Sequence, residues 1–374
     1  MTHRLRSLAA AALLLSLIAA CSAGRGTSSG QAASPTTSDA VVACPETPEP
    51  ESAAVAAWKG QQDPSLFPSI IDPGGTLVCG ENRMMFSFLD ASGVPIASPD
   101  RTVQVDLFDL GLDSESPALS TTAEFIWAIE DQVGVYIANV AFPASGLWGA
   151  QFTTSLAGAE PEVIRVPFDV RSERSVIGVG DRAPASDTPT LADVGGDISK
   201  ISTDDAPVPA FYETSVADAL AEHRPFVLAF ATPKFCATAQ CGPTLDRLKP
   251  IAAANPGVTF INVEPYELED VEGQLQPVLS GDPPALTPTA TTAEWGLPSE
   301  PWVFVVDRDG IVRGSFMLIF GDEELSAAVE EVAGPPPASP GPSSAASPGP
   351  SSAASPQAST AASPQASSAA SPSP

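Results

Sequence analysis

Basic residues are scarce in this sequence of 374 residues. Lys and Arg number 17 against 45 Asp and Glu, so the formal net charge is -28 at pH 7. A surface this acidic repels nucleic-acid phosphates and anionic lipid headgroups, which excludes nucleic acid as a partner. We attribute the acidity to the solubility of an exported protein and infer no substrate from it.

Long apolar runs are also few. The stretch from Leu8 to Ala20, preceded by Arg4 and Arg6, is interrupted only by Ser16. It is too short for a permanent membrane span and predicts a signal peptide over residues 1–20. No other segment is apolar enough to cross a bilayer.

The end of this stretch, Leu17-Ile-Ala-Ala-Cys21, resembles the lipobox of bacterial lipoproteins. The resemblance implies that Cys21 is acylated and becomes the new N-terminus. We therefore expect a protein attached by lipid to the extracytoplasmic face of the cell membrane. The alternative is an ordinary signal peptide cleaved after Ala20, which would leave Cys21 as an odd thiol.

Cysteines are few, five in the whole chain. Subtracting Cys21 leaves an even number, which suits an oxidising compartment. The pairing expected from their positions is Cys44 with Cys79 and Cys236 with Cys241. We predict that the Cys44–Cys79 bond is structural and pins the start of the ordered chain.

The two ends of the chain lack the residues that build a core. Residues 21–60, rich in Ala, Ser, Thr, Pro and Glu, predict a flexible tether. Residues 335–374 include a Ser-Pro-rich repeat with a period of eight and carry no charge. This segment is predicted to be a disordered tail that serves as a spacer or a glycosylated stalk.

Residues 61–172 show the alternation of β-strands, with turn sequences between the runs. Short strands at this spacing predict an antiparallel sandwich. The run Gly134–Trp148 resembles the hairpin of Ig-like and YtkA-like extracellular domains. That resemblance implies an Ig-like β-sandwich with Tyr136 and Trp148 in its core, and it points to no functional residue there.

Residues 178–334 alternate strands and helices instead. Strands are expected over Phe226–Ala231, Val258–Val263 and Ile311–Phe320, and helices over Ser215–His223, Pro243–Ala254 and Asp322–Val332. Such alternation predicts an α/β sheet covered on both faces. The expected fold class is therefore multidomain, with an N-terminal antiparallel β-sandwich and a C-terminal α/β domain.

Cys236 and Cys241 fall between the first of those strands and the helix that follows it. A helix N-terminus carries partial positive charge and free N–H groups, which favour a thiolate. Gly242-Pro243 supports a helix start here, because proline is tolerated in the first turn. This position suits dithiol–disulfide chemistry.

Several segments of this region resemble the thioredoxin superfamily. Cys241-Gly-Pro-Thr244 is similar to the family's Cys-Gly-Pro-Cys, and Trp295–Pro301 is similar to the approach to its cis-proline. The resemblance implies a thioredoxin-like domain in which Pro301 orients a partner protein beside the cysteines. Ala229 stands where the family keeps a buried aspartate.

The spacing of the cysteines departs from that family. Four residues separate Cys236 from Cys241, so a single helical turn cannot pair them. A loop must fold back to bring their Cα atoms within about 4.4–6.8 Å. Either cysteine could be the attacking one.

We expect from this a thiol-disulfide oxidoreductase that acts on exported protein thiols or disulfides, with catalytic residues Cys236, Cys241 and Pro301 and no cofactor or metal. One alternative is a thioredoxin-fold binding scaffold whose disulfide is structural. Copper delivery is another, although related copper chaperones add a histidine downstream and none follows Cys241. Thiol peroxidase activity is the third.

Three further sites contain residue types that can act in catalysis or bind metal. His223 is predicted to be a surface residue at a helix end. Glu264 could face the thiols as a proton acceptor, but a solvated turn residue is the favoured interpretation. Asp307–Gly310 is predicted to form a hairpin turn and not a metal loop.

Overall fold

The computed structural model describes residues 44–59, 66–129 and 132–334. Cys21, the signal sequence, the first half of the expected tether and the C-terminal repeats lie outside these residues. The described chain is mostly β-sheet, with few helices and several antiparallel sheets. None of its helices is long and apolar enough to cross a membrane.

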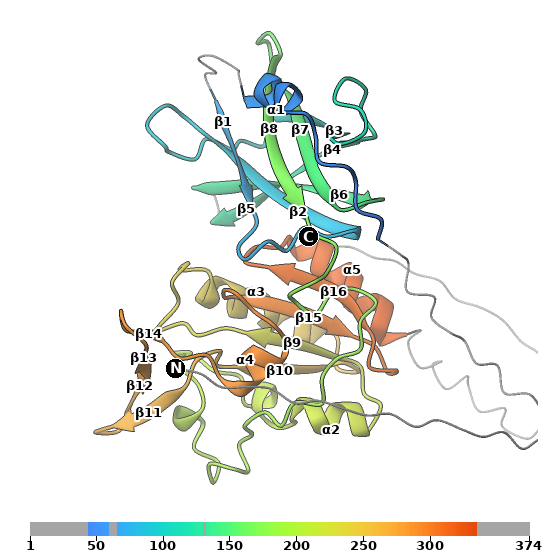
Figure 1. Ribbon diagram of the computed structural model, residues 1–374. Helices are drawn as coiled ribbons and strands as arrows, with labels where there is room; N and C mark the ends of the chain where they lie inside the picture. The colour runs from blue at the N-terminus through green and yellow to red at the C-terminus, as the bar shows by residue number, and fades with distance from the viewer. Residues whose placement is uncertain (1–43, 60–65, 130–131, 335–374) are drawn as a thin grey trace, which may run out of the picture. The chain divides into compact units, whose positions relative to one another are not determined.

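Two four-stranded antiparallel sheets form the first half of the described chain (Figure 1). One has the order β1-β2-β6-β5 and the other β4-β3-β7-β8. The bounds are β1 Phe67–Ile71, β2 Gly80–Leu89, β3 Arg101–Asp109, β4 Leu119–Thr122, β5 Glu124–Ile129, β6 Val133–Phe142, β7 Gly146–Leu156 and β8 Glu162–Val170. This arrangement is consistent with a β-sandwich.

Aromatic side chains fill the core between these sheets. Phe86 of β2 and Phe152 of β7 lie with ring centroids 4.6 Å apart, so strands of both sheets contribute. Tyr136 and Trp148 are buried in the same region, as the sequence predicts. Ala144 accepts a hydrogen bond from the indole N–H of Trp148 at 3.2 Å, which satisfies the one polar atom of that ring.

The ordered chain begins earlier than the sequence suggests. Helix α1, Ser52–Lys59, lies within the expected tether. Trp58 at its end is buried, with its ring centroid 4.8 Å from that of Phe108 in β3. The free energy gained by burying the Trp58 indole is large enough to order a segment whose composition is polar and rich in proline. Composition alone therefore puts the end of the tether too late in the sequence.

The second half contains a four-stranded sheet in the order β10-β9-β15-β16. Strand β10 (Thr259–Val263) pairs parallel with β9 (Phe226–Phe230), and β15 (Trp302–Val306) pairs antiparallel with β9 and with β16 (Val312–Met317). The strands expected here are present with shifted ends, and residues 307–310 form the predicted turn between β15 and β16.

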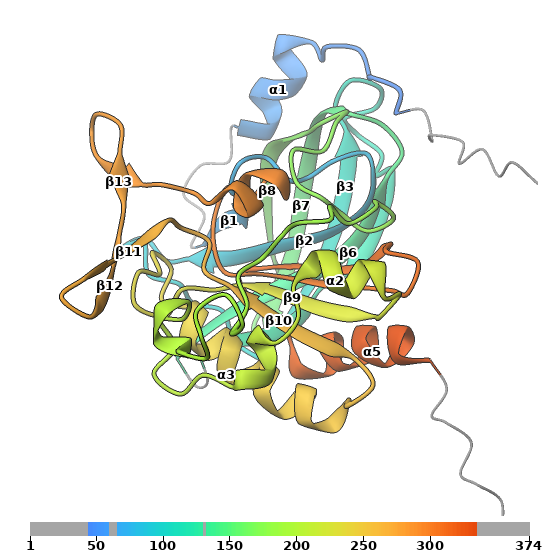
Figure 2. The same ribbon diagram turned by 90° about the horizontal axis from the view of Figure 1, so that it is seen from below.

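Helices cover both faces of this sheet (Figure 2). On one face, α3 (Cys241–Ala254) and α5 (Asp322–Ala333) pack against Val227, Ala229 and Val305. On the other, α2 (Val216–Ala221) packs against Phe226 and Leu228. Strands buried on both faces explain why β9 and β15 are continuously apolar.

The segment between β10 and β15 holds elements that the sequence did not predict. Two small hairpins, β11–β12 (Leu268–Val271, Gln274–Pro277) and β13–β14 (Leu279–Ser280, Ala285–Leu286), precede α4 (Ala290–Glu294). The short 3-10 helices η1 (Ile198–Lys200) and η2 (Pro209–Tyr212) precede α2. These strands and helices are too short for the spacing of their apolar residues to show the periodicity of a strand or a helix.

Candidate functional site

Cys236 and Cys241 form a disulfide at the junction of β9 and α3. Their Cα atoms are 6.0 Å apart, so the loop between them does fold back as the spacing required. The reversal passes through Ala239, whose φ of 59° lies in the left-handed region. The disulfide is therefore held in a tight loop at the start of a helix.

Cys236 is the more accessible of the two. It is half-buried, whereas Cys241 is fully buried as the first residue of α3. The backbone N–H of Cys241 donates a hydrogen bond of 3.2 Å to Sγ of Cys236. This N–H has no acceptor within the helix, so the positive end of α3 is directed at the Cys236 sulfur.

The helix begins two residues earlier than the sequence predicts, at Cys241 and not at Pro243. Pro243 is still tolerated, because the first four N–H groups of a helix lack intrahelical acceptors. The earlier start places a cysteine at the helix end itself. Cys241 is thereby buried, and its amide is free to reach Cys236.

Pro301 lies beside the cysteine loop, at the start of β15. The Glu300–Pro301 peptide is cis, which confirms the prediction for this bond. The Thr238 hydroxyl donates a hydrogen bond of 3.0 Å to the backbone carbonyl of Glu300. This hydrogen bond ties the cysteine loop to the residue directly before Pro301.

Glu300 is the functional candidate that sequence reasoning missed. Its side chain is buried, and a carboxylate oxygen and the two cysteine sulfurs all lie within 4.8 Å of one another. The backbone N–H of Ala237 donates 2.8 Å to Oε1, and the Tyr266 hydroxyl donates to Oε2. The one feature of the sequence that could have identified Glu300 is its position directly before the expected cis-proline.

Tyr266 donates a hydrogen bond to Glu300 through its phenol hydroxyl. Burial, followed by the hydrogen bond and the charge of Glu300, raises the pKa of Tyr266 above its ordinary value. The phenol therefore stays neutral and continues to donate to the carboxylate. Together with Ala237, it fixes the orientation of Glu300 beside the sulfurs.

Glu264 is not the solvated turn residue that the sequence favoured. It is buried at the end of β10, and Oε1 accepts a hydrogen bond of 2.6 Å from the Thr203 backbone. Oε2 has no partner among the described residues. Burial raises the pKa of Glu264. Its described hydrogen bond goes to Thr203 and not to the cysteines, so Glu300 is the carboxylate at the disulfide.

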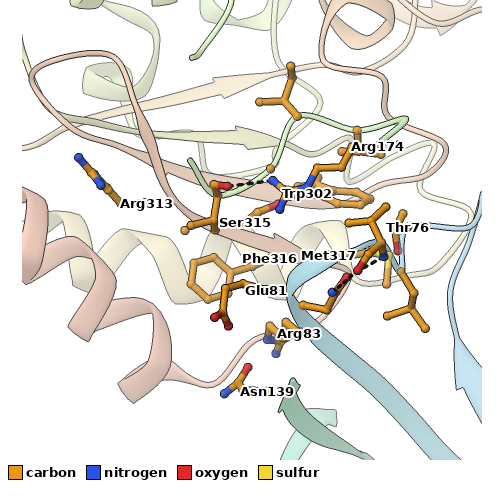
Figure 3. Close-up of a pocket in the computed structure, with 18 of the residues that line it drawn as sticks. Thr76, Glu81, Arg83, Asn139, Arg174, Trp302, Arg313, Ser315, Phe316 and Met317 are labelled. Atoms are coloured by element: carbon orange, nitrogen blue, oxygen red, sulfur yellow. Dashed lines mark hydrogen bonds between the residues drawn. The ribbon is translucent and has the colours of Figure 1, made fainter. Parts of the chain in front are cut away.

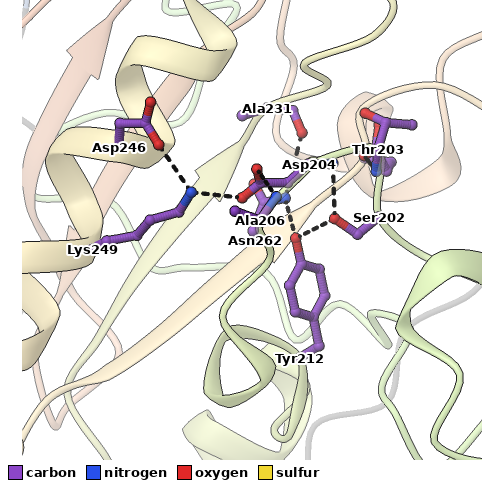
Figure 4. Close-up of polar contacts among 10 residues, drawn as sticks. Ser202, Thr203, Asp204, Ala206, Tyr212, Ala231, Asp246, Lys249 and Asn262 are labelled. Carbon is purple, nitrogen blue, oxygen red and sulfur yellow. Dashed lines mark hydrogen bonds and ion pairs between the residues drawn. The ribbon is translucent and has the colours of Figure 1, made fainter.

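A polar network anchors the segment that precedes η2 (Figure 4). The Tyr212 hydroxyl lies 2.8 Å from Oγ of Ser202 and accepts 3.0 Å from Nδ2 of Asn262 in β10. Nearby, Lys249 of α3 pairs with Asp204 at 3.0 Å. Burial raises the pKa of Tyr212 to about 12, so its hydroxyl stays neutral. We assign this network a structural role.

The other predicted disulfide, Cys44–Cys79, is also present. Its Cα atoms are 5.8 Å apart, and it joins the segment before α1 to the residue preceding β2. Cys21 lies outside the described residues. His223 is exposed just beyond α2, with Nδ1 3.1 Å from the Arg308 carbonyl, as expected of a surface residue.

A pocket of about 290 Å³ has neither Cys236 nor Cys241 in its lining (Figure 3). Its lining includes Trp302, Phe316 and the three arginines Arg83, Arg174 and Arg313. Each arginine is paired with a carboxylate: Glu324 with Arg83, Asp181 with Arg174 and Asp307 with Arg313. Because these charges are already neutralised, the pocket is not a ready anion site.

Comparison with known proteins gives no family for this chain. No protein-family model matches it, and no curated protein does. Among solved structures, it is similar to the crystal structure of a DUF4426 family protein from Pseudomonas aeruginosa PAO1. The identity is 11%, the match covers 30% of this chain and 97% of that one, and the TM-score is 0.22. A likeness this low carries no argument about fold or function.

Proposed function

We propose that this chain is a lipid-anchored, extracytoplasmic thiol-disulfide oxidoreductase with a thioredoxin-like domain behind an Ig-like sandwich. The observation that carries the proposal is the Cys236 sulfur, half-buried and 3.2 Å from the N–H that begins α3. An N–H at a helix start stabilises a thiolate, which is the reactive form in disulfide exchange.

The arrangement of the second sheet supports the thioredoxin-like part. The features that support it are a parallel strand pair, two antiparallel strands, helices on both faces and a cysteine at the start of the helix after β9. Pro301 at the start of β15 lies next to the cysteine loop, where a partner chain would have to approach.

The reaction begins with both cysteines reduced. The Cys236 thiolate attacks one sulfur of a partner's disulfide, and the partner's other sulfur leaves as a thiolate. The Cys241 thiol then loses its proton to the Glu300 carboxylate and attacks Cys236. The bond between Cys236 and the partner breaks and the Cys236–Cys241 disulfide forms. The partner leaves as a dithiol after its two thiolates take up the proton held by Glu300 and one proton from solvent.

The difference in burial supports different tasks for the two cysteines. Cys236 is accessible and faces the helix N–H, so it meets the partner. Cys241 is fully buried and can reach only Cys236, so it resolves the mixed disulfide. Glu300, within 4.8 Å of both sulfurs, is the nearest described carboxylate that can take the proton.

A trapping experiment tests this function. Cys241→Ser should accumulate a mixed disulfide between Cys236 and partner proteins, because no thiol remains to resolve it. The matched Cys236→Ser variant should trap nothing. If neither variant, nor the wild type, exchanges with a model peptide disulfide, the proposal is wrong.

The second candidate is a binding scaffold whose disulfide is structural. Two hydrogen bonds from Ala237 and Thr238 tie the cysteine loop to Glu300 and cover the segment before Pro301, which favours a closed loop. The reduction potential separates the two functions. A value near or above about -200 mV supports exchange, and one below about -300 mV supports a structural bridge.

The anchored location is proposed from the sequence around Cys21. Two disulfides in the described chain support an oxidising compartment. Cys21→Ser should move the protein out of the membrane fraction or block its processing, because the acylated residue is lost. Mature wild-type protein that is entirely soluble, with an unmodified N-terminal Cys21, would overturn the anchor.

A further inference from the structure

We propose that the reduced form of this site binds a thiophilic divalent cation such as Zn²⁺ through Cys236, Cys241 and Glu300. The inference concerns the same cysteines as the proposed exchange reaction. It requires only that their disulfide can be reduced, and not that the protein exchanges disulfides with partners.

The donor atoms are already gathered. Both sulfurs and one oxygen of Glu300 lie within 4.8 Å of one another. Tetrahedral Zn²⁺ has Zn–S bonds of about 2.3 Å and Zn–O bonds of about 2.0–2.2 Å, which puts its ligand atoms about 3.5–3.8 Å apart. The Cα atoms of the two cysteines are 6.0 Å apart, so their sulfurs can take up this separation once the S–S bond is broken.

The charge of the reduced site favours a cation. Two thiolates and a carboxylate would place three negative groups in a site where Cys241 and Glu300 are buried. No ion pair among the described residues involves Glu300. Buried like charges at this distance are unfavourable unless a counter-charge lies among them, and a divalent cation bound by all three groups would supply it.

The carboxylate is also oriented as metal-bound carboxylates are. Ala237 donates to Oε1 and Tyr266 to Oε2, which fixes the plane of the Glu300 carboxylate while each oxygen keeps a lone pair. Such outer hydrogen bonds are typical of metal sites and tune the affinity of the ligand. Three protein ligands leave a fourth position for water.

The ligand set selects the class of metal. Two thiolates favour Zn²⁺ and Cu⁺ over hard cations such as Mg²⁺ and Ca²⁺. A buried carboxylate as third donor suits Zn²⁺, which binds sulfur and oxygen together. Cu⁺ prefers soft ligands alone, so its binding would not depend on Glu300.

Oxidation would release the metal. A low-molecular-weight disulfide accepts two electrons from the zinc-bound thiolates, takes two protons from solvent and is released as two thiols. The two Zn–S bonds break, the Cys236–Cys241 bond forms, and Zn²⁺ departs because a disulfide sulfur is a weak ligand. Metal binding is thereby restricted to the reduced state.

Zinc titration of the full-length reduced protein at pH 7 tests the site, with a chromophoric chelator as competitor. The Cys236→Ser/Cys241→Ser variant defines the baseline from other thiols. We expect one additional equivalent of Zn²⁺ in the reduced wild type and none in the disulfide form. Glu300→Gln should weaken this binding at least about tenfold, and Glu264→Gln, a matched buried glutamate, should leave it unchanged.

Two results would overturn the inference. One is a reduced wild type that binds no more Zn²⁺ than the double-serine baseline. The other is equal affinity in Glu300→Gln, which would leave a simple dithiol with no carboxylate ligand. Disulfide-exchange activity of the wild type is measured separately, with chelator present. A wild type that binds zinc but does not exchange disulfides would count only against the proposed enzymatic function.

Discussion

The backbone N–H of Cys241 donates a hydrogen bond of 3.2 Å to Sγ of Cys236, its own disulfide partner. The fully buried cysteine thus supplies the helix-terminal donor, and the half-buried cysteine receives it. The two sulfurs therefore differ both in exposure and in electrostatic surroundings. This asymmetry leads to the first prediction.

In Cys241→Ser, the helix N–H stabilises the Cys236 thiolate and the Glu300 carboxylate opposes it. We expect the N–H, which contacts the sulfur directly, to have the larger effect, so that the pKa of Cys236 lies below its usual value of about 8.5. The rate of alkylation by iodoacetamide as a function of pH measures this pKa. In Cys236→Ser, the buried Cys241 should be alkylated far more slowly at every pH. Faster labelling of Cys241 than of Cys236 would contradict the assignment of the accessible nucleophile.

Glu300→Gln should raise the reduction potential of the disulfide. The carboxylate lies within 4.8 Å of both sulfurs and repels thiolates, so removing its charge favours the reduced form. We expect about a tenfold shift of the equilibrium with glutathione, or about 30 mV. Glu264→Gln is the control and should leave the potential unchanged. A lowered potential in Glu300→Gln would show that its hydrogen bonds outweigh its charge.

Glu264→Gln should stabilise the fold at neutral pH. Burial raises the pKa of Glu264 above the ordinary 4.5, so the folded state binds a proton more readily than the unfolded state. Wild-type stability therefore falls as pH rises from 4.5 through the folded pKa. The variant has no charge to desolvate and therefore lacks this loss. We expect it to be more stable at neutral pH by about 1–3 kcal/mol, the range found for burying a polar group without full compensation.

Urea unfolding of wild type and Glu264→Gln between pH 4 and pH 8 measures this difference. The two free energies of unfolding should converge near pH 4 and separate as pH rises. Glu269→Gln, at an exposed position in β11, is the matched control and should follow the wild type. Parallel curves for wild type and Glu264→Gln would mean that Glu264 does not titrate with a raised pKa.

Cys44→Ser/Cys79→Ser should destabilise the fold without changing the chemistry of the second site. The disulfide spans a sequence separation of 35 residues. Closing a loop of that length in the unfolded chain is worth about 4 kcal/mol in the chain-entropy model. Thermal unfolding measures the loss. A changed reduction potential at Cys236–Cys241 in this variant would contradict a purely structural role.

Several features could be predicted from sequence because they depend on local patterns. Continuous apolar runs flanked by turn residues located β9 and β10, and the residues around Trp295–Pro301 located the cis-proline. The positions of the four remaining cysteines along the chain gave both disulfide pairs. Each of these signals lies within a few residues or follows from simple counting.

Only the tertiary structure decided which groups meet at the disulfide. Glu300 is 59 positions after Cys241 and reaches the sulfurs because β15 pairs with β9 in one sheet. Tyr266, which follows β10, reaches the Glu300 carboxylate and not the sulfurs. Burial, which separates Cys236 from Cys241 and raises the pKa of Glu264, is likewise a property of the packed chain. The sequence by itself determined where the cysteines and the apolar strands lie. Long-range strand pairing determined which side chains surround the cysteines, because a carboxylate's neighbours in space are not encoded in its neighbours along the chain.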